Sequence, residues 1–301
     1  MTYHPGEAAV QRRTGVARDG WGSAGTRAEI PPVAAEFLRG RRFLALGTPA
    51  DDGTVWADAV TGPPGFATAG PSDRTIHIAG LPRLLTPHLA AERDVGLLAL
   101  DPPTRRRMRV NGTARRDGDR LVVRTEQVYS NCPKYIQTRD VREDAPPHTP
   151  GRPRTGRYLT EDQRAAISRA DTFFVATHAP GYGTDVSHRG GNPGFVTAER
   201  DRLAWPEYVG NGMYMTLGNL ELNPSCGLLF VDWERGHTLH LTGRAVVDWD
   251  AGRSAPVPGA RQIVDLVIDG VVEIPGALPL SWRFGEHHRF NPAVRDGALR
   301  P

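Results

Sequence analysis

Residues that can bind an anion gather in the segment DVSHRGGNPGFV, residues 185–196. Ser187, His188 and Arg189 supply hydrogen-bond donors and positive charge. Gly190 and Gly191 have no Cβ, so the backbone can approach a ligand closely there. The pattern predicts a phosphate-binding loop, and the alternative is a glycine-rich hairpin whose arginine faces solvent.

A second polar segment, EYVGNGMYMTLGNLELNP (207–224), follows within a few residues. Its glycine-asparagine pairs are turn signals that expose backbone N–H groups, a threonine adds a hydroxyl, and the stretch ends in a short helical turn. Turn amides, a hydroxyl and a nearby arginine together indicate a nest for phosphate. The candidate ligand residues of this segment are Gly210, Asn211, Met215, Thr216, Leu217, Gly218 and Asn219.

The segment EQVYSNCPKYIQTR (126–139) supplies further candidates. Lys134, the sole lysine, can act as a point charge toward a phosphate or an electron-rich ring, and Tyr135 can stack on a planar ligand. Asn131 and Cys132 lie beside them. The alternative is a connecting loop in which Cys132 only packs, and for that cysteine packing is the favoured interpretation.

The remaining motifs mainly exclude known kinds of functional site. The run RRRMR (105–109) could hold the extra phosphate of NADPH, but such runs are more typical of a solvated hairpin face. The chain lacks a P-loop, a complete G-x-G-x-x-G, H-E-x-x-H and G-x-S-x-G, and its histidines show no spacing for a metal site.

An internal repeat sets these segments in context. FLALGT begins at 43 and TFFVAT at 172, a shift of 129; VGLLALD at 95 and CGLLFVD at 226 are shifted by 131. At the positions of Ser187, His188 and Arg189 the first copy has Asp58, Ala59 and Val60. The polar set is therefore confined to the second copy, and we expect it to bind a ligand.

The elements that carry these residues are mostly strands. Short runs of Val, Leu, Phe and Trp separated by turn dipeptides indicate a mostly antiparallel barrel in each copy, with helices over 31–40, 85–94 and 159–170. The expected organisation is an arm (1–29), a first barrel (30–142), a Pro/Arg-rich linker (143–158), a second barrel (159–253) and a C-terminal extension (254–301).

Composition fits a globular protein. The chain has 301 residues, 39% of them hydrophobic, and a net charge of +3, which is too weakly basic to predict a nucleic-acid partner. Two cysteines cannot form a disulfide framework. We see no apolar run long enough for a membrane span and no secretion signal, so a cytoplasmic location is expected.

These motifs resemble the pyridoxamine 5′-phosphate oxidase-like superfamily, the FMN-binding split barrels. The resemblance rests on YHPGEAAVQRRTGVA, VYSNCPKYIQ and the blocks from DVSHRGGNPGFV to HLTGRA. It implies a mainly β fold of two tandem split barrels, each six-stranded, with FMN between them. Arg189 and its glycines would line the flavin, Asn211, Thr216 and Asn219 would hold phosphate and ribityl chain, and Lys134 and Tyr135 would approach from the other barrel.

The expected function is that of an FMN-dependent oxidoreductase acting on a small molecule, with NAD(P)H or oxygen as redox partner and no metal. Lys134, Tyr135 and His188 are the catalytic candidates. The barrels could pair within one chain, or two chains could form a homodimer. A C-terminal Arg/His substrate motif is not evident, which makes vitamin B6 a weak substrate guess. The alternatives are a non-catalytic flavin- or heme-binding protein and a deazaflavin-dependent reductase.

Overall fold

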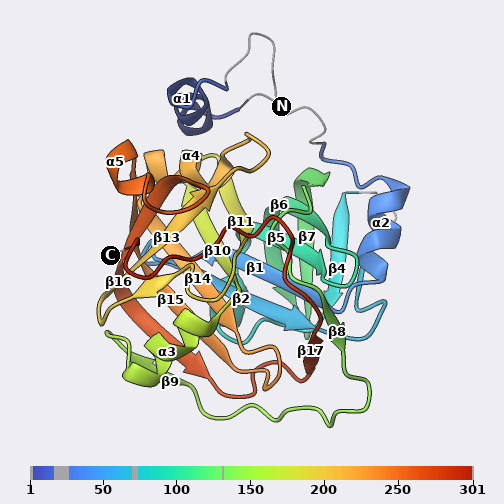
Figure 1. Ribbon diagram of the computed structural model, residues 1–301. Helices are drawn as coiled ribbons and strands as arrows, with labels where there is room; N and C mark the ends of the chain where they lie inside the picture. The colour runs from blue at the N-terminus through green and yellow to red at the C-terminus, as the bar shows by residue number, and fades with distance from the viewer. Residues whose placement is uncertain (1–2, 17–26, 70–73, 131, 300–301) are drawn as a thin grey trace.

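The computed structural model describes residues 3–16, 27–69, 74–130 and 132–299. Most of the regular structure is strand, arranged in two large antiparallel sheets that lie side by side (Figure 1). The fold is mainly β, with two tandem split barrels, as the sequence predicted.

The first barrel follows the strand order β2-β1-β5-β6-β7-β4-β3. Its strands are β1 (Phe43–Pro49), β2 (Val55–Thr61), β3 (Ala67–Ala69), β4 (Thr75–Ala79), β5 (Arg93–Asp101), β6 (Arg106–Asp117) and β7 (Arg120–Ser130). The second barrel follows the same order, β11-β10-β14-β15-β16-β13-β12. Its strands are β10 (Thr172–Ala179), β11 (Gly183–Gly190), β12 (Thr197–Ala198), β13 (Arg202–Tyr208), β14 (Ser225–Val231), β15 (Thr238–Asp248) and β16 (Ala260–Ile274).

The repeat extends to the pairing register. Phe43 pairs with Thr61 in the first barrel and Thr172 with Gly190 in the second, so both partners are shifted by 129. The β-bulge after Asn111 recurs after Thr242, a shift of 131. Each sheet path has seven strands among the described residues instead of the six expected, because the short strands β3 and β12 add an edge.

Strand β16 corrects the expected boundary at 253. It pairs with β15 and β13, so it is a central strand of the second barrel, and the barrel continues to Ile274. The linker-like stretch 254–261 misled the prediction, because it is only the connection that carries the chain from β15 to β16. The true extension then forms β17 (Trp282–Phe284), which pairs with β8 (Arg139–Val141), while β9 (Arg154–Gly156) of the expected linker adds to β16.

The helices match the predictions in two cases out of three. The structure has α2 (Pro32–Arg39) and α3 (Glu161–Arg169), but over 85–94 only a short 3-10 helix, η1 (Thr86–Leu89), precedes β5. Helix α4 (Met215–Leu222) lies within the second polar segment, where a short helical turn was expected, and α5 (Ala251–Ser254) follows β15. None of the helices in the described ranges is long and apolar enough to cross a membrane.

Helix α1 (Pro5–Arg13) was not predicted within the arm. Pro5 at its first position, Glu7 in its first turn and a His4 side chain that caps its amides explain why it forms. It packs on α4 of the second barrel, far along the chain (Figure 1).

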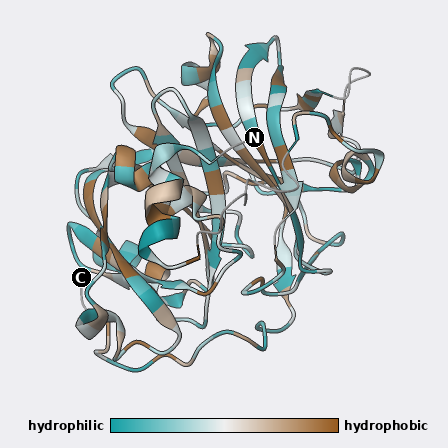
Figure 2. Cartoon of the chain, turned by 90° about the horizontal axis from the view of Figure 1, so that it is seen from above, coloured by the Kyte–Doolittle hydropathy of each residue, from teal (hydrophilic) through white to brown (hydrophobic). Residues whose placement is uncertain are grey.

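Strand β1 explains why some strand sequences are continuous apolar runs without alternating polar residues. Leu44 and Leu46 point into the core of the first barrel, whereas Phe43 and Ala45 point into a cluster shared with Phe174 of the second barrel. Side chains alternate between faces along a strand, so a strand buried on both faces has no polar alternation. Several strand ribbons change between brown and teal along their length (Figure 2).

Candidate functional site

A pocket opens between the two barrels at the end of β11, and we call it the anion pocket. Its wall is formed by strand β11, the end of β13 with the loop 209–214, the start of α4, strand β6 of the first barrel and residues 132–135. It brings together most predicted residues: Lys134, Tyr135, Ser187, His188, Arg189, Gly190, Gly210, Asn211, Met215, Thr216 and Leu217.

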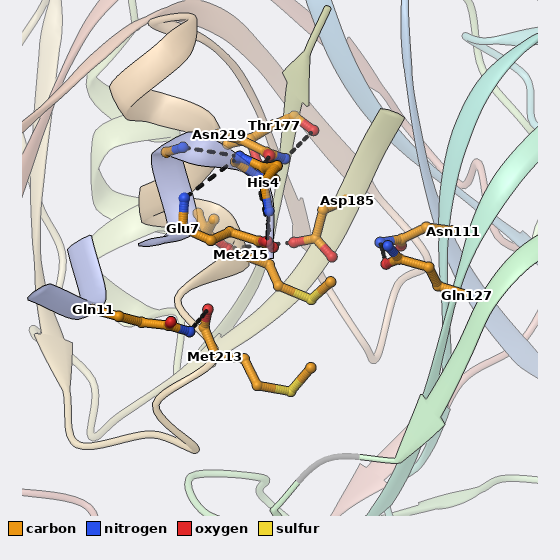
Figure 3. Close-up of polar contacts among 12 residues, drawn as sticks. His4, Glu7, Gln11, Asn111, Gln127, Thr177, Asp185, Met213, Met215 and Asn219 are labelled. Atoms are coloured by element: carbon orange, nitrogen blue, oxygen red, sulfur yellow. Dashed lines mark hydrogen bonds and ion pairs between the residues drawn. The ribbon is translucent and has the colours of Figure 1, made fainter. Parts of the chain in front are cut away.

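Gly218 and Asn219 do not line this pocket. Asn219 Oδ1 lies 3.0 Å from His4 Nε2, and its amide nitrogen donates to the Thr177 carbonyl at 3.2 Å (Figure 3). Gly218 lies against Glu7, where an added Cβ would come within 2.6 Å. These two predicted cofactor-binding residues therefore lie outside the pocket, and in this geometry they hold α1 against α4.

Gly191 also lies outside the pocket wall. Its amide donates to the Asp171 carbonyl at 3.1 Å, and a Cβ there would lie 2.6 Å from the Phe195 ring. Gly191 is therefore a packing glycine. Asn131, the remaining predicted ligand residue, falls outside the described residues.

The two arginines that the sequence analysis assigned to a solvated face line the anion pocket. Arg107 and Arg109 are alternate residues of β6, so they point to the same side of the strand, and Arg109 is buried. Arg106, which precedes them on the opposite side, is exposed, and its guanidinium lies over the Phe37 ring. The alternation within RRRMR was the signal available in the sequence.

Arg107 meets His188 across the boundary between the barrels. Its Nη1 lies 3.1 Å from His188 Nδ1. Burial lowers the pKa of Arg107 to about 9, and burial together with the neighbouring arginines holds the pKa of His188 well below its usual range. Because a guanidinium only donates, Nδ1 accepts and the proton of the neutral imidazole lies on Nε2.

That Nε2–H group is buried and has no hydrogen-bond partner among the described residues, and neither has Arg107 Nε. A buried donor without an acceptor costs about 1–3 kcal/mol. Two such donors beside one pocket indicate that an acceptor from outside the chain belongs there.

Arg109 is balanced by an acid. It forms an ion pair with Asp185 of β11, and that carboxylate also accepts from Tyr129 at 3.2 Å and from Ser187 at 3.3 Å. Thr216 donates to Ser187 at 2.9 Å. The hydroxyls predicted to bind phosphate therefore form a chain of hydrogen bonds that ends on Asp185. A bound anion would have to compete with this carboxylate for them.

Arg189 is likewise paired. Its Nε donates to Glu207 at 2.7 Å, and the indole of Trp205 donates to the same carboxylate oxygen at 3.1 Å. Arg189 lines the pocket, but its charge is largely neutralised by Glu207. Arg107 differs from it, because the side chain that Arg107 contacts is a neutral imidazole.

Helix α4 begins at the pocket without a side-chain cap. Its N-cap residue, Tyr214, has a left-handed backbone with φ of 57°, and no described side chain accepts from the first-turn amides. The first helical residues, Met215 and Thr216, line the pocket. The positive end of the helix dipole therefore faces the same space as Arg107.

The loop 132–135 closes the pocket from the first barrel. Tyr135 has φ of 66°, donates from its hydroxyl to the Val209 carbonyl at 3.1 Å and packs against Tyr208, with ring centroids 5.2 Å apart. A Cβ on Gly190 would lie 2.0 Å from the Tyr135 carbonyl. Gly190 is thus required for contact between the barrels rather than for ligand approach.

The first barrel closes its equivalent site with its own carboxylate. Asp58, at the position of Ser187, accepts from the amides of Ala59 and Leu84 at 2.7 Å and of Leu85 at 3.3 Å. The turn amides before η1 are thereby satisfied within the protein.

Comparisons with known proteins concern the fold. No family model matches the chain, and no curated protein matches it. Among solved structures, HupZ from Group A Streptococcus matches with 17% identity, 36% of this chain, 89% of that chain and a TM-score of 0.30. The match to the FAD-binding protein from Mycobacterium smegmatis covers 39% of this chain and 97% of that chain, with 10% identity and a TM-score of 0.29.

A third match is a protein from Clostridium acetobutylicum that is related to general stress protein 26, of the pyridoxinephosphate oxidase family. This match covers 42% of this chain and 92% of that chain, with 13% identity and a TM-score of 0.27. The chain is structurally similar to these proteins over about 40% of its length.

Proposed function

We propose that the anion pocket binds the phosphate of FMN and that the protein is an FMN-dependent oxidoreductase acting on a small molecule. One observation carries this proposal: two buried donors without partners among the described residues, Arg107 Nε and His188 Nε2, lie where the uncapped end of α4 also faces. Four cations and one carboxylate line the pocket, which favours a ligand with negative charge.

The size of the pocket limits which part of the cofactor fits. The pocket measures about 110 Å³, well below the roughly 300 Å³ of a site that holds a whole drug-sized ligand. A phosphate group fits this volume, whereas a three-ring flavin does not. The ring would have to lie toward the mouth, where Tyr135 and Tyr208 are the available aromatic side chains.

Bound FMN would supply the redox chemistry, since it accepts a hydride or an electron pair from one substrate and passes it to another. Arg107 remains charged at neutral pH, because a pKa of about 9 lies above it, and so attracts the phosphate. His188 stays neutral and offers one N–H. Lys134 adds a second positive charge at the wall, where it would favour a more negative, reduced ring.

The experiment is a titration of the purified protein with FMN, followed by the quenching of flavin fluorescence. Arg107→Gln should weaken binding about 10- to 100-fold, the range for a charge-assisted hydrogen bond of about 1.5–3 kcal/mol. Arg106→Gln is the matched control, since that side chain points away from the pocket, and its affinity should equal that of the wild type. Equal loss in both variants, or no flavin binding at all, would refute the proposal.

A second measurement separates an enzyme from a carrier. Stopped-flow reduction of the bound flavin by NADH or NADPH, followed by oxygen, should give complete reduction and reoxidation over repeated cycles if the protein is an oxidoreductase. A tightly bound flavin that no nicotinamide reduces would favour the non-catalytic alternative.

A further inference from the structure

A second pocket, which we call the aromatic pocket, lies at the start of β10 and measures about 470 Å³. Helix α3, the β14–β15 hairpin and the small β8–β17 sheet enclose it. Its lining shares no described residue with that of the anion pocket. The proposed function does not use it.

Four Phe and Trp side chains contribute to its wall. Trp233 and Trp282 meet edge to face with centroids 5.2 Å apart, and both line the pocket together with Phe284. Arg139 lies over the Trp233 ring at 5.2 Å and over the Phe284 ring at 5.5 Å. Its Nη2 donates to both oxygens of Asp171, at 2.5 and 2.6 Å, so this buried pair is neutral as a whole.

Two buried polar groups of the wall have no hydrogen-bond partner among the residues that the structure describes. They are the hydroxyl of Thr172 and the indole N–H of Trp233, whose residues are 3% and 7% exposed. Both residues line the aromatic pocket. A donor left unpaired inside a protein calls for an explanation, and an acceptor from a ligand is one.

The first barrel serves as an internal control. At the positions of Asp171 and Thr172 it has Arg42 and Phe43, and at the position of Trp233 it has Pro102. Phe43 fills the interface between the barrels instead of presenting a hydroxyl. The polar groups of the aromatic pocket are therefore a feature of the second barrel and not of the repeated fold.

The charge of the wall differs from that of the anion pocket. Five acidic side chains and three arginines line the aromatic pocket, whereas four cations and one acid line the anion pocket. An excess of carboxylates disfavours anions, and aromatic faces attract cations and flat rings.

We propose that the aromatic pocket binds a small, flat heteroaromatic compound that is uncharged or cationic and carries a hydrogen-bond acceptor. The ring packs against Trp233 and Phe284, and the acceptor pairs with both the Trp233 N–H and the Thr172 hydroxyl. The size of the pocket admits one such ring system with substituents.

The test uses three probes that share one ring and differ in charge: neutral nicotinamide, cationic 1-methylnicotinamide and anionic nicotinate. Ligand-observed NMR titrations of the full-length protein should show binding of the neutral and cationic probes, with nicotinate at least about tenfold weaker. Thr172→Val keeps the shape and removes the hydroxyl, and Trp233→Phe removes the N–H. Each should weaken nicotinamide binding about fivefold, the factor for one hydrogen bond.

Arg107→Gln, a change in the anion pocket, should leave nicotinamide affinity within about twofold of the wild type. Loss of binding in that variant would place the probe in the anion pocket and overturn the proposal. So would preference for nicotinate, unchanged affinity in Thr172→Val, or no binding of any probe at millimolar concentration. If Trp233→Phe fails to fold, Thr172→Val alone decides, because it is isosteric.

Discussion

Arg107 and His188 lie 3.1 Å apart although they belong to different barrels. The contact makes the anion pocket a shared site, in which one repeat supplies an arginine and the other a neutral imidazole. Neither barrel alone contains the pair, so the site needs both barrels.

His188 should make stability depend on pH on the acid side. Its pKa is held well below the usual 6.5 in the folded protein, so as the pH falls the unfolded chain takes up a proton at a higher pH than the folded protein does. The stabilising contribution is complete above pH 6.5 and is lost as the pH falls below it. The difference in unfolding free energy between the wild type and His188→Gln should shrink by up to about 1.4 kcal/mol per pH unit below 6.5, measured by urea denaturation. A constant difference would contradict the assignment.

Glu7 should act in the opposite direction. Burial raises the pKa of this carboxyl to about 7, so the folded protein holds its proton where the unfolded chain has lost it. Its contribution is complete below pH 4.5 and is lost as the pH rises to about 7, by about 3 kcal/mol. Glu7→Gln should abolish this loss. The unfolding midpoint of the variant, taken relative to that of the wild type, should therefore be higher at pH 8 than at pH 5. A relative midpoint that is higher at pH 5 than at pH 8 would refute the raised pKa of Glu7.

The pair of Arg189 and Glu207 can be tested with a double-mutant cycle. Arg189→Met leaves a buried carboxylate with only the Trp205 indole as a described partner and should cost about 3 kcal/mol of unfolding free energy. Adding Glu207→Gln should recover at least half of that loss, because the unpaired charge is then removed. Additive losses in the double variant would show that the two side chains do not act as a pair.

The duplicated bulge predicts matched effects in the two barrels. A Cβ on Gly112 would lie 2.0 Å from the Arg124 carbonyl, and a Cβ on Gly243 would lie 2.1 Å from the Val267 carbonyl. Alanine at either position should destabilise the protein by about 2–4 kcal/mol. Gly210→Ala is the control, since no described atom lies within 4 Å of its added Cβ, and its thermal midpoint should be unchanged. Tolerance of alanine at only one bulge would contradict the equivalence of the barrels.

The fold followed from the sequence where the repeat could be aligned. The shift between Phe43 and Thr172 holds in the pairing register, because paired residues are separated by the same number of positions in both hairpins. The boundary at 253 failed because β16 begins after a proline-rich connection that resembles a linker. Helix α1 was missed because its cap is His4, which is not among the usual capping residues.

The site was predictable only in part. Ser187, His188 and Thr216 could be located because their types differ between the copies. Asn219 looked like a ligand residue, yet its partner is His4, 215 positions away, and no local pattern reveals such a contact. Arg107 was assigned to solvent because a run of arginines hides the alternation that directs it into the pocket.

The most direct test of the anion pocket compares FMN with riboflavin, which differ by the phosphate alone. Isothermal titration of the wild type should give an affinity for FMN at least about 100-fold higher than for riboflavin, and Arg107→Gln should reduce that ratio about tenfold or more. Equal affinities for the two flavins in the wild type would contradict the account, because the pocket would then not be recognising a phosphate.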